Sequence, residues 1–117
     1  MADKQLDVEH LFTLDLQVAE GVQIIKGGPH GTRMIAEVAG GTFTGERLTG
    51  SVVPPGGDWV TARADRNIQL DVRLTLVTDD DAVILMQYKG IADPAAGVAR
   101  SAPQFETGDE RYAWLNN

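Results

Sequence analysis

The chain has 117 residues, a formal charge of −7 and no cysteine. This length predicts one domain spanning residues 1–117. The lack of cysteine excludes a disulfide framework, a thiolate nucleophile and cysteine-based zinc sites. The ten basic residues are scattered, so no nucleic-acid surface is indicated, and no apolar run approaches the roughly 20 residues of a membrane-spanning helix. A polar N-terminus unlike a signal peptide makes the cytoplasm the expected location.

Short segments with a two-residue period follow one another between glycine and proline turns, which is typical of a β-sandwich or barrel. Residues 41–53, with internal glycines, are expected to form one bent strand. Residues 54–58, with the sequence Pro-Pro-Gly-Gly-Asp, are expected to form a turn. The other expected strands cover residues 10–18, 21–26, 32–38, 59–64, 67–77, 82–90 and 111–115.

The clearest alternation of apolar and polar residues lies in residues 67–77. A helix would place Ile68 and Leu70 about 200° apart, so the pattern favours a strand. The three aspartates at residues 79–81 then predict a three-residue turn, because that loop pairs Leu74 with Met86 and keeps apolar residues opposite one another. The predicted core consists of Phe12, Leu14, Leu16, Ile68, Leu70, Val72, Leu74, Leu76, Ile84 and Met86.

Several segments, taken in order, resemble one known family. They are EHLFTL at residues 9–14, GGTFTG at 40–45, GDW at 57–59, LTLVTDD at 74–80, and FETG at 105–108 followed by YAWLN at 112–116. Together they are similar to the bacterial and fungal family of domain of unknown function 3237. The resemblance implies a lipocalin-like or calycin-like antiparallel β-barrel and no assigned activity. Members carry a longer insertion at residues 91–101 and continue past residue 116, which leaves open whether the barrel closes completely.

Few residues point to a specific chemistry. His10 and His30 lie on separate elements without partners at metal-ligand spacing, so neither predicts a metal site. The aspartates at residues 79–81 suit a turn, where adjacent side chains diverge, better than a cation site. No phosphate-loop, dinucleotide or nucleophile-elbow motif is present, and no cofactor is expected.

Two groups of residues have alternative interpretations. Asp71 and Arg73 share the polar face of their strand, and an outward, solvated face is favoured because the opposite apolar face needs a core. The large side chains with one polar group either line a pocket or fill the core. These are Trp59, Tyr88, Tyr112 and Trp114.

We expect a small β-barrel that binds a small apolar organic ligand in its interior, with Arg73, Asp58 or Tyr88 fixing the ligand's orientation. One alternative is an isomerase, cyclase or hydratase in which His10, Asp58 or Glu106 transfers protons. Another is a non-catalytic, self-associating protein with a filled core. The candidate ligand-binding residues are Trp59, Asp71, Arg73, Tyr88, Tyr112 and Trp114.

Self-association is also expected, because an incompletely closed barrel leaves backbone groups unpaired along an edge. We expect a homodimer or larger assembly with residues 111–117 at the interface. The alternative is a monomer in which residues 1–8 cover the free edge.

Overall fold

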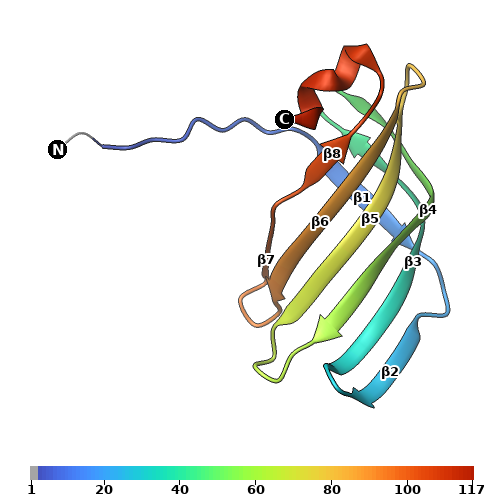
Figure 1. Cartoon of the computed structure of the whole chain (residues 1–117), viewed down its shortest axis with the longest axis vertical. Coiled ribbons are helices and arrows are strands. Elements are labelled where there is room, and N and C mark those ends of the chain that lie inside the picture. Colours follow the sequence, from blue (N-terminus) through green and yellow to red (C-terminus); the bar gives the residue numbers. More distant parts are fainter. Residues whose placement is uncertain (1–2) are drawn as a thin grey trace.

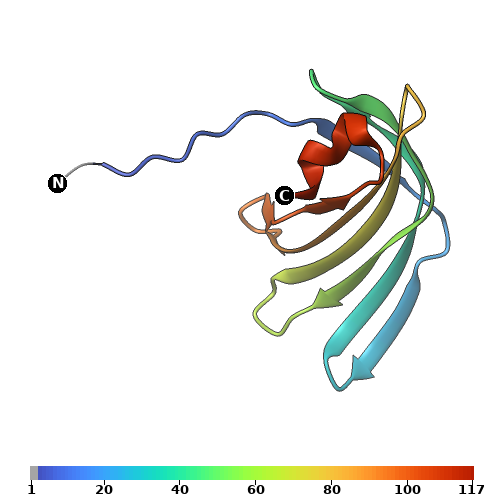
Figure 2. The same ribbon diagram turned by 45° about the horizontal axis from the view of Figure 1, so that its top comes forward.

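A computed structural model describes residues 3–117 as an all-β fold. Eight strands form one antiparallel sheet, which curls into a half-barrel, and a short 3-10 helix lies on its concave side (Figures 1 and 2). This confirms the predicted fold class. The elements are β1 (Thr13–Val18), β2 (Gln23–Gly28), β3 (Gly31–Thr44), β4 (Thr49–Ala62), β5 (Ile68–Thr78), β6 (Val83–Asp93), β7 (Val98–Ser101), β8 (Gln104–Glu106) and η1 (Glu110–Asn116).

The four long strands β3, β4, β5 and β6 form the centre of the sheet. On one side, β1 pairs with the end of β3 and β2 with its beginning. On the other side, β8 and β7 pair with successive parts of β6. Within residues 3–117 no strand pairing joins these two sides, so the barrel remains open. In the same part of the chain, no helix is long and apolar enough to cross a bilayer.

The β5–β6 hairpin has the predicted register. Leu74 pairs with Met86, and Arg73 pairs with Gln87. The turn is closed by a hydrogen bond of 3.0 Å from the Asp81 amide to the Thr78 carbonyl, and Asp81 adopts a positive φ of 70°. The three-residue loop therefore sorts the apolar side chains of both strands onto one face.

The core lies on the concave face, but the sequence predicted only part of it. Of the expected residues, Ile68 does not join the core, while the others are buried or pack against it. Two of the omissions follow from a bulge in β3 between Glu37 and Gly41, which inverts the alternation so that Val38 and Phe43 both face inward. The buried core residues that the sequence did not predict are Val38, Phe43, Leu48, Val52 and Leu115.

The expected bent strand over residues 41–53 and the expected turn at residues 54–58 are both wrong. The chain reverses at residues 45–48, where Gly45 passes so close to the segment before β1 that a Cβ atom would lie 2.0 Å from the Leu11 carbonyl oxygen. Residues 54–58 instead continue β4 through a bulge between Val53 and Gly57. Proline is tolerated there because the ladder is already interrupted.

The expected strand over residues 111–115 is also wrong, because these residues belong to η1. The Asp109 carboxylate caps the helix by accepting a hydrogen bond of 2.9 Å from the Arg111 amide. Asn116 exchanges two hydrogen bonds with the backbone of Thr107, and Leu115 is buried in the core. The helix therefore closes one end of the half-barrel rather than extending its edge.

The inner-face assignment predicts the result of truncating Leu74, which is 1% exposed. Leu74→Ala is expected to lower the free energy of unfolding by about 2–5 kcal/mol, measured by chemical denaturation. Arg73→Ala, on the exposed face of the same strand, is the matched control and should change it by less than about 0.5 kcal/mol. A loss below about 1 kcal/mol for Leu74→Ala would contradict the assignment.

Candidate functional site

Two polar side chains face the concave side of the half-barrel, one on each side of Val72. Asp58 of β4 pairs with Val72 of β5, and Val72 pairs with Tyr88 of β6. Directly paired residues point to the same face, so all three side chains project inward. Two strand spacings place the Cα atoms of Asp58 and Tyr88 about 10 Å apart.

The surroundings of Asp58 favour its protonated form. Its Oδ1 atom accepts a hydrogen bond of 3.2 Å from the Asp71 amide. Burial raises the pKa of the Asp58 carboxyl, against the opposing effect of this hydrogen bond, and the charge of Asp71 adds to the increase. Burial also raises the pKa of the Tyr88 hydroxyl, with a further increase from the charge of Asp58. Tyr88 is thus held as a hydrogen-bond donor.

Both groups keep polar atoms that the fold does not use. Within residues 3–117, Asp58 has that one side-chain hydrogen bond and Tyr88 has none. Every buried side-chain oxygen or nitrogen in the same part of the chain has a partner. The Oδ2 atom of Asp58 and the hydroxyl of Tyr88 are therefore open to solvent and free to bond to another molecule.

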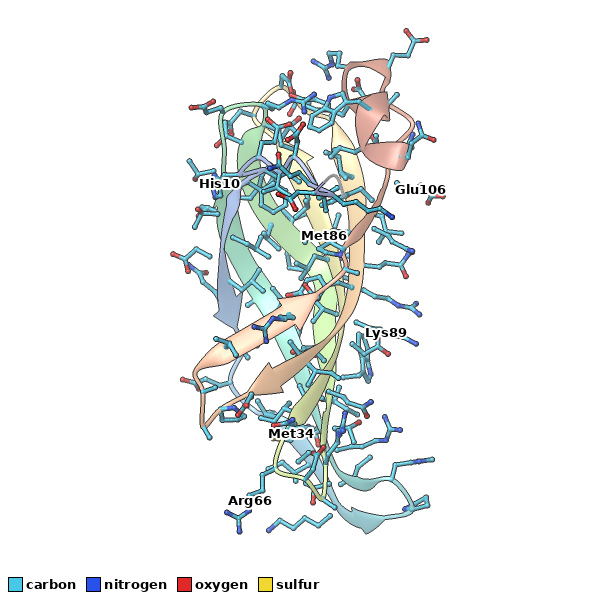
Figure 3. The ribbon with its side chains drawn as sticks, turned by 90° about the vertical axis from the view of Figure 1, so that its left-hand side faces the viewer. His10, Met34, Arg66, Met86, Lys89 and Glu106 are labelled. Carbon is cyan, nitrogen blue, oxygen red and sulfur yellow. The ribbon has the colours of Figure 1, made fainter. Side chains whose placement is uncertain are left out.

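The inner face around this pair is apolar. Ala36 pairs with Asp58, and Met34 pairs with Val60 one step further along the same strands. Figure 3 shows Met34 and Met86 on the inner side of the sheet. Next to Tyr88, Gly90 carries no side chain because the backbone of β7 passes close to it, and an added Cβ there would lie 2.5 Å from the Arg100 carbonyl oxygen. Asp58 and Tyr88 thus stand on an apolar concave surface, which is typical of a site for a small organic molecule.

Three of the candidate ligand-binding residues face outward instead. Trp59, Asp71 and Arg73 lie on the convex side, as does Lys89, which Figure 3 shows pointing away from the interior. The outward orientation agrees with the favoured interpretation of Asp71 and Arg73, which line a cavity of about 250 Å³ together with Tyr88. The outer face has its own cavity of about 490 Å³, lined by Arg33, Trp59, Thr61, Gln69, Leu70, Asp71, Lys89, Gly90 and Ile91.

The other two acid–base candidates do not join Asp58. His10 lies exposed at the rim, with Nε2 3.1 Å from the Thr13 hydroxyl. Glu106 points away on the outer side of β8 (Figure 3). The structure thus brings together Asp58 and Tyr88 and leaves His10 and Glu106 apart from them.

Tyr112 and Trp114 hold η1 in place. The Tyr112 hydroxyl donates a hydrogen bond of 2.8 Å to the Asp80 carboxylate, and the Arg47 guanidinium lies 3.7 Å from the Trp114 ring centre. Hydrogen bonds from Thr78 and then Tyr112 lower the pKa of Asp80. The aspartates at residues 79–81 therefore serve the turn, and no cluster of potential metal ligands occurs in the described part of the chain.

Sequence reasoning missed the apolar part of this site, formed by Met34, Ala36 and Val60. It treated residues 54–58 as a turn, which separated Asp58 from the strand that carries it. The signal was present in the alternation of Asp58, Val60 and Ala62 with Trp59 and Thr61.

Comparison with known proteins places the chain in a family. The model described as "Protein of unknown function (DUF3237)" matches residues 6–117. The chain belongs to this family. The match confirms the resemblance seen in the sequence, and the family description assigns no activity.

The relatives of this DUF3237 protein include uncharacterised bacterial proteins. The UPF0311 protein of Bradyrhizobium diazoefficiens is 32% identical over 126 residues, which cover 94% of this chain and 82% of the relative. The UPF0311 protein of Clostridium acetobutylicum is 27% identical over 130 residues, with coverage of 97% and 82%.

Solved structures share the fold of the half-barrel. A conserved protein of unknown function from Rhodopseudomonas palustris matches with a TM-score of 0.87 at 28% identity, covering 97% of this chain and 85% of its own. A β-barrel-like protein from Acinetobacter baumannii matches with a TM-score of 0.72 at 27% identity, with coverage of 97% and 86%. A protein described as an enzyme from Penicillium herquei matches with a TM-score of 0.82 at 26% identity, with coverage of 100% and 84%.

The opposite pKa directions of Asp58 and Asp80 predict opposite effects of replacing them. A raised pKa means that ionisation of Asp58 costs stability once the pH rises above the ordinary carboxyl range. Asp58→Asn is therefore expected to raise the melting temperature at pH 7, with the difference vanishing in acid. The lowered pKa of Asp80 means that its ionised form contributes stability that is lost as the pH falls through that pKa. Asp80→Asn should accordingly lower the melting temperature at pH 7.

Thermal denaturation of both variants between pH 3 and pH 8 checks this prediction, because the range extends to both sides of the ordinary aspartate pKa of about 3.9. Equal melting temperatures for wild type and Asp58→Asn across the range would show that Asp58 is not held in a desolvated position.

Proposed function

We propose that this protein binds a small, mainly apolar organic molecule on the inner face of its half-barrel and that Asp58 and Tyr88 transfer and direct protons on it. The observation that carries the proposal is the pair of unused polar atoms, the Asp58 Oδ2 and the Tyr88 hydroxyl, on an apolar concave surface. Solvent-accessible polar groups that make no hydrogen bond within the fold are available to fix the orientation of a ligand on such a surface.

The two groups suit complementary tasks. The Tyr88 hydroxyl can donate a hydrogen bond to a carbonyl oxygen of the ligand, which stabilises negative charge that develops there. The Asp58 carboxylate can remove a proton from a carbon or hydroxyl group of the ligand and return it at another position. A raised pKa makes the ionised Asp58 a stronger base than an exposed aspartate. Isomerisation, cyclisation and water addition each need only such a transfer.

A relative supports a catalytic role for the fold. The Penicillium herquei protein that covers this whole chain is described as an enzyme. One end of the half-barrel does have a filled interior, because η1, Phe12 and Phe105 pack against the core there. Asp58 and Tyr88 lie at the border of this core, since Tyr88 packs against it and Val72 between them is buried.

Binding can be tested with Nile red, an uncharged apolar dye with a carbonyl group. We expect its fluorescence to increase and shift to the blue on adding the protein, as in other apolar sites. Val60→Asp, which introduces a charge on the inner face opposite Met34, should weaken binding about tenfold or more. Gln69→Asp introduces the same charge in the outer cavity and should leave binding nearly unchanged.

The reverse result would contradict the proposal. If Gln69→Asp abolishes dye binding and Val60→Asp does not, the ligand site is the outer cavity beside Trp59 and Lys89. Circular dichroism of each variant checks that the half-barrel remains folded.

Proton transfer can be tested separately with 2-tetralone, an apolar ketone with exchangeable C–H groups next to its carbonyl. We expect the wild-type protein to accelerate exchange of these hydrogens for deuterium, followed by NMR. Asp58→Asn should lower the rate about 100-fold, within the usual range for loss of a general base. Asp15→Asn, which changes an exposed carboxylate of β1, is the matched control. Equal rates for the wild type and Asp58→Asn would refute the catalytic role while leaving the binding role in place.

A further inference from the structure

Residues 3–12 precede β1 as an extended arm that runs away from the body of the fold (Figure 1). The arm covers neither edge of the sheet, in contrast to the expected monomer in which residues 1–8 cover one; residues 1 and 2 lie outside the described part. Leu6 is 86% exposed and Val8 is 83% exposed, more than any other large apolar side chain among residues 3–117. This exposure needs an explanation, because large apolar side chains favour burial.

The arm continues the pattern of β1. Leu6 and Val8 have the same parity as Phe12 and Leu14, whose side chains pack against the core. Within residues 5–9 the intervening positions carry the polar residues Gln5, Asp7 and Glu9, whereas His10 and Leu11 interrupt the alternation before Phe12. The arm therefore has the alternation of a half-buried strand. Its own chain gives it no sheet to join, because β3 ends at Thr44, which pairs with Thr13.

The base of the arm is held in a fixed position. Glu9 forms a salt bridge of 2.8 Å with Arg47, and Arg47 stacks on the Trp114 ring of η1. The ring of Phe12 makes an edge contact with Phe105 of β8, with the centroids 6.0 Å apart. These contacts direct the arm outward from a point beside β8.

A groove opens at the same place. Its volume is about 570 Å³, and it lies between the free edge of β8 and η1. In the described part of the chain β8 pairs only with β6, so its other edge presents unpaired backbone groups to a strand. The groove is lined by Leu11, Pro103, Gln104, Phe105, Trp114, Leu115, Asn116 and Asn117. An extended segment with apolar side chains at alternate positions fits such an edge and groove.

We propose that the arm of one copy occupies this groove on a second copy, in a two-fold dimer with exchanged arms. Leu11 is both the base of the arm and a wall of the groove, so a two-fold axis near Leu11 brings each arm to its partner's groove. The six residues 3–8, which precede the Glu9–Arg47 salt bridge, reach about 20 Å when extended. Leu6 and Val8 enter the groove, and Asp7 faces solvent.

This interface differs from the expected one. Residues 111–117 form η1 rather than an edge strand, so they contribute a wall of the groove and not the free edge. The free edge belongs to β8. The dimer does not depend on ligand binding by Asp58 and Tyr88.

Sedimentation at several concentrations up to about 100 μM tests the dimer. Leu6→Glu should weaken association about tenfold or more, because it buries a charge in the groove. Gln5→Glu adds the same charge on the solvent face of the arm and should have less than about a twofold effect. A monomeric wild type, or equal effects of the two variants, would overturn the proposal.

Crosslinking tests the exchange directly, since the natural chain has no cysteine. A Val8→Cys protein is mixed with a Gln104→Cys protein of different mass and treated with a short bis-maleimide reagent. A covalent heterodimer is expected. Val8→Cys mixed with Arg66→Cys, whose cysteine lies in an exposed turn at the far end (Figure 3), should give none. Equal crosslinking in the two mixtures would contradict arm exchange.

Discussion

The register of the β5–β6 hairpin determines which side chains face the inside of the half-barrel. Its three-residue turn pairs Val72 with Tyr88 and Leu74 with Met86, and β4 is then aligned on β5 so that Asp58 also faces inward. A slip of one residue would move every side chain of β6 to the other face. The core and the candidate site therefore depend on the same alignment, and a mutation that shifts the turn would disrupt both.

The site illustrates a conflict between stability and binding. Asp58 stands among apolar side chains, where burial raises its pKa and one of its oxygens has no partner in the fold. An apolar residue at that position would suit the core better. Side chains that are unfavourable for folding are common at functional sites, because their unsatisfied groups are available to a ligand. The open barrel makes this arrangement less costly, since solvent reaches the carboxylate when no ligand is bound.

The sequence predicted those parts of the fold in which local pattern and pairing agree. In residues 67–90, strict alternation and a turn of clear length specify the hairpin without help from the rest of the chain. Residues 54–58 carry turn-forming residues, yet β3 and β5 pair with the rest of β4 on both sides and keep the segment extended. Tyr112 and Trp114 have the spacing of a strand, but the capping carboxylate of Asp109 and the burial of Leu115 favour a helix.

The sequence indicated the individual residues of the candidate site but not that they lie close together. Asp58 and Tyr88 were both among the candidates, whereas their position on either side of Val72 depends on the alignment of three strands that are distant in sequence. The outward position of Trp59 follows from the same alignment. Local periodicity gives the relative orientation of neighbours within a strand, and only the pairing with β5 says which of the two faces is inside.

The number of residues in the β4 bulge determines which side chains of this strand face inward after it. Val53 pairs with Thr75 and Gly57 with Arg73, so β4 advances by four residues where β5 advances by two. The surplus is even, and the alternation of inner and outer side chains is the same before and after the bulge. Adding or removing a single residue there would exchange the places of Asp58 and Trp59, turning the carboxylate out to solvent and the indole into the interior. Length changes at this bulge during the divergence of the family should therefore occur in steps of two.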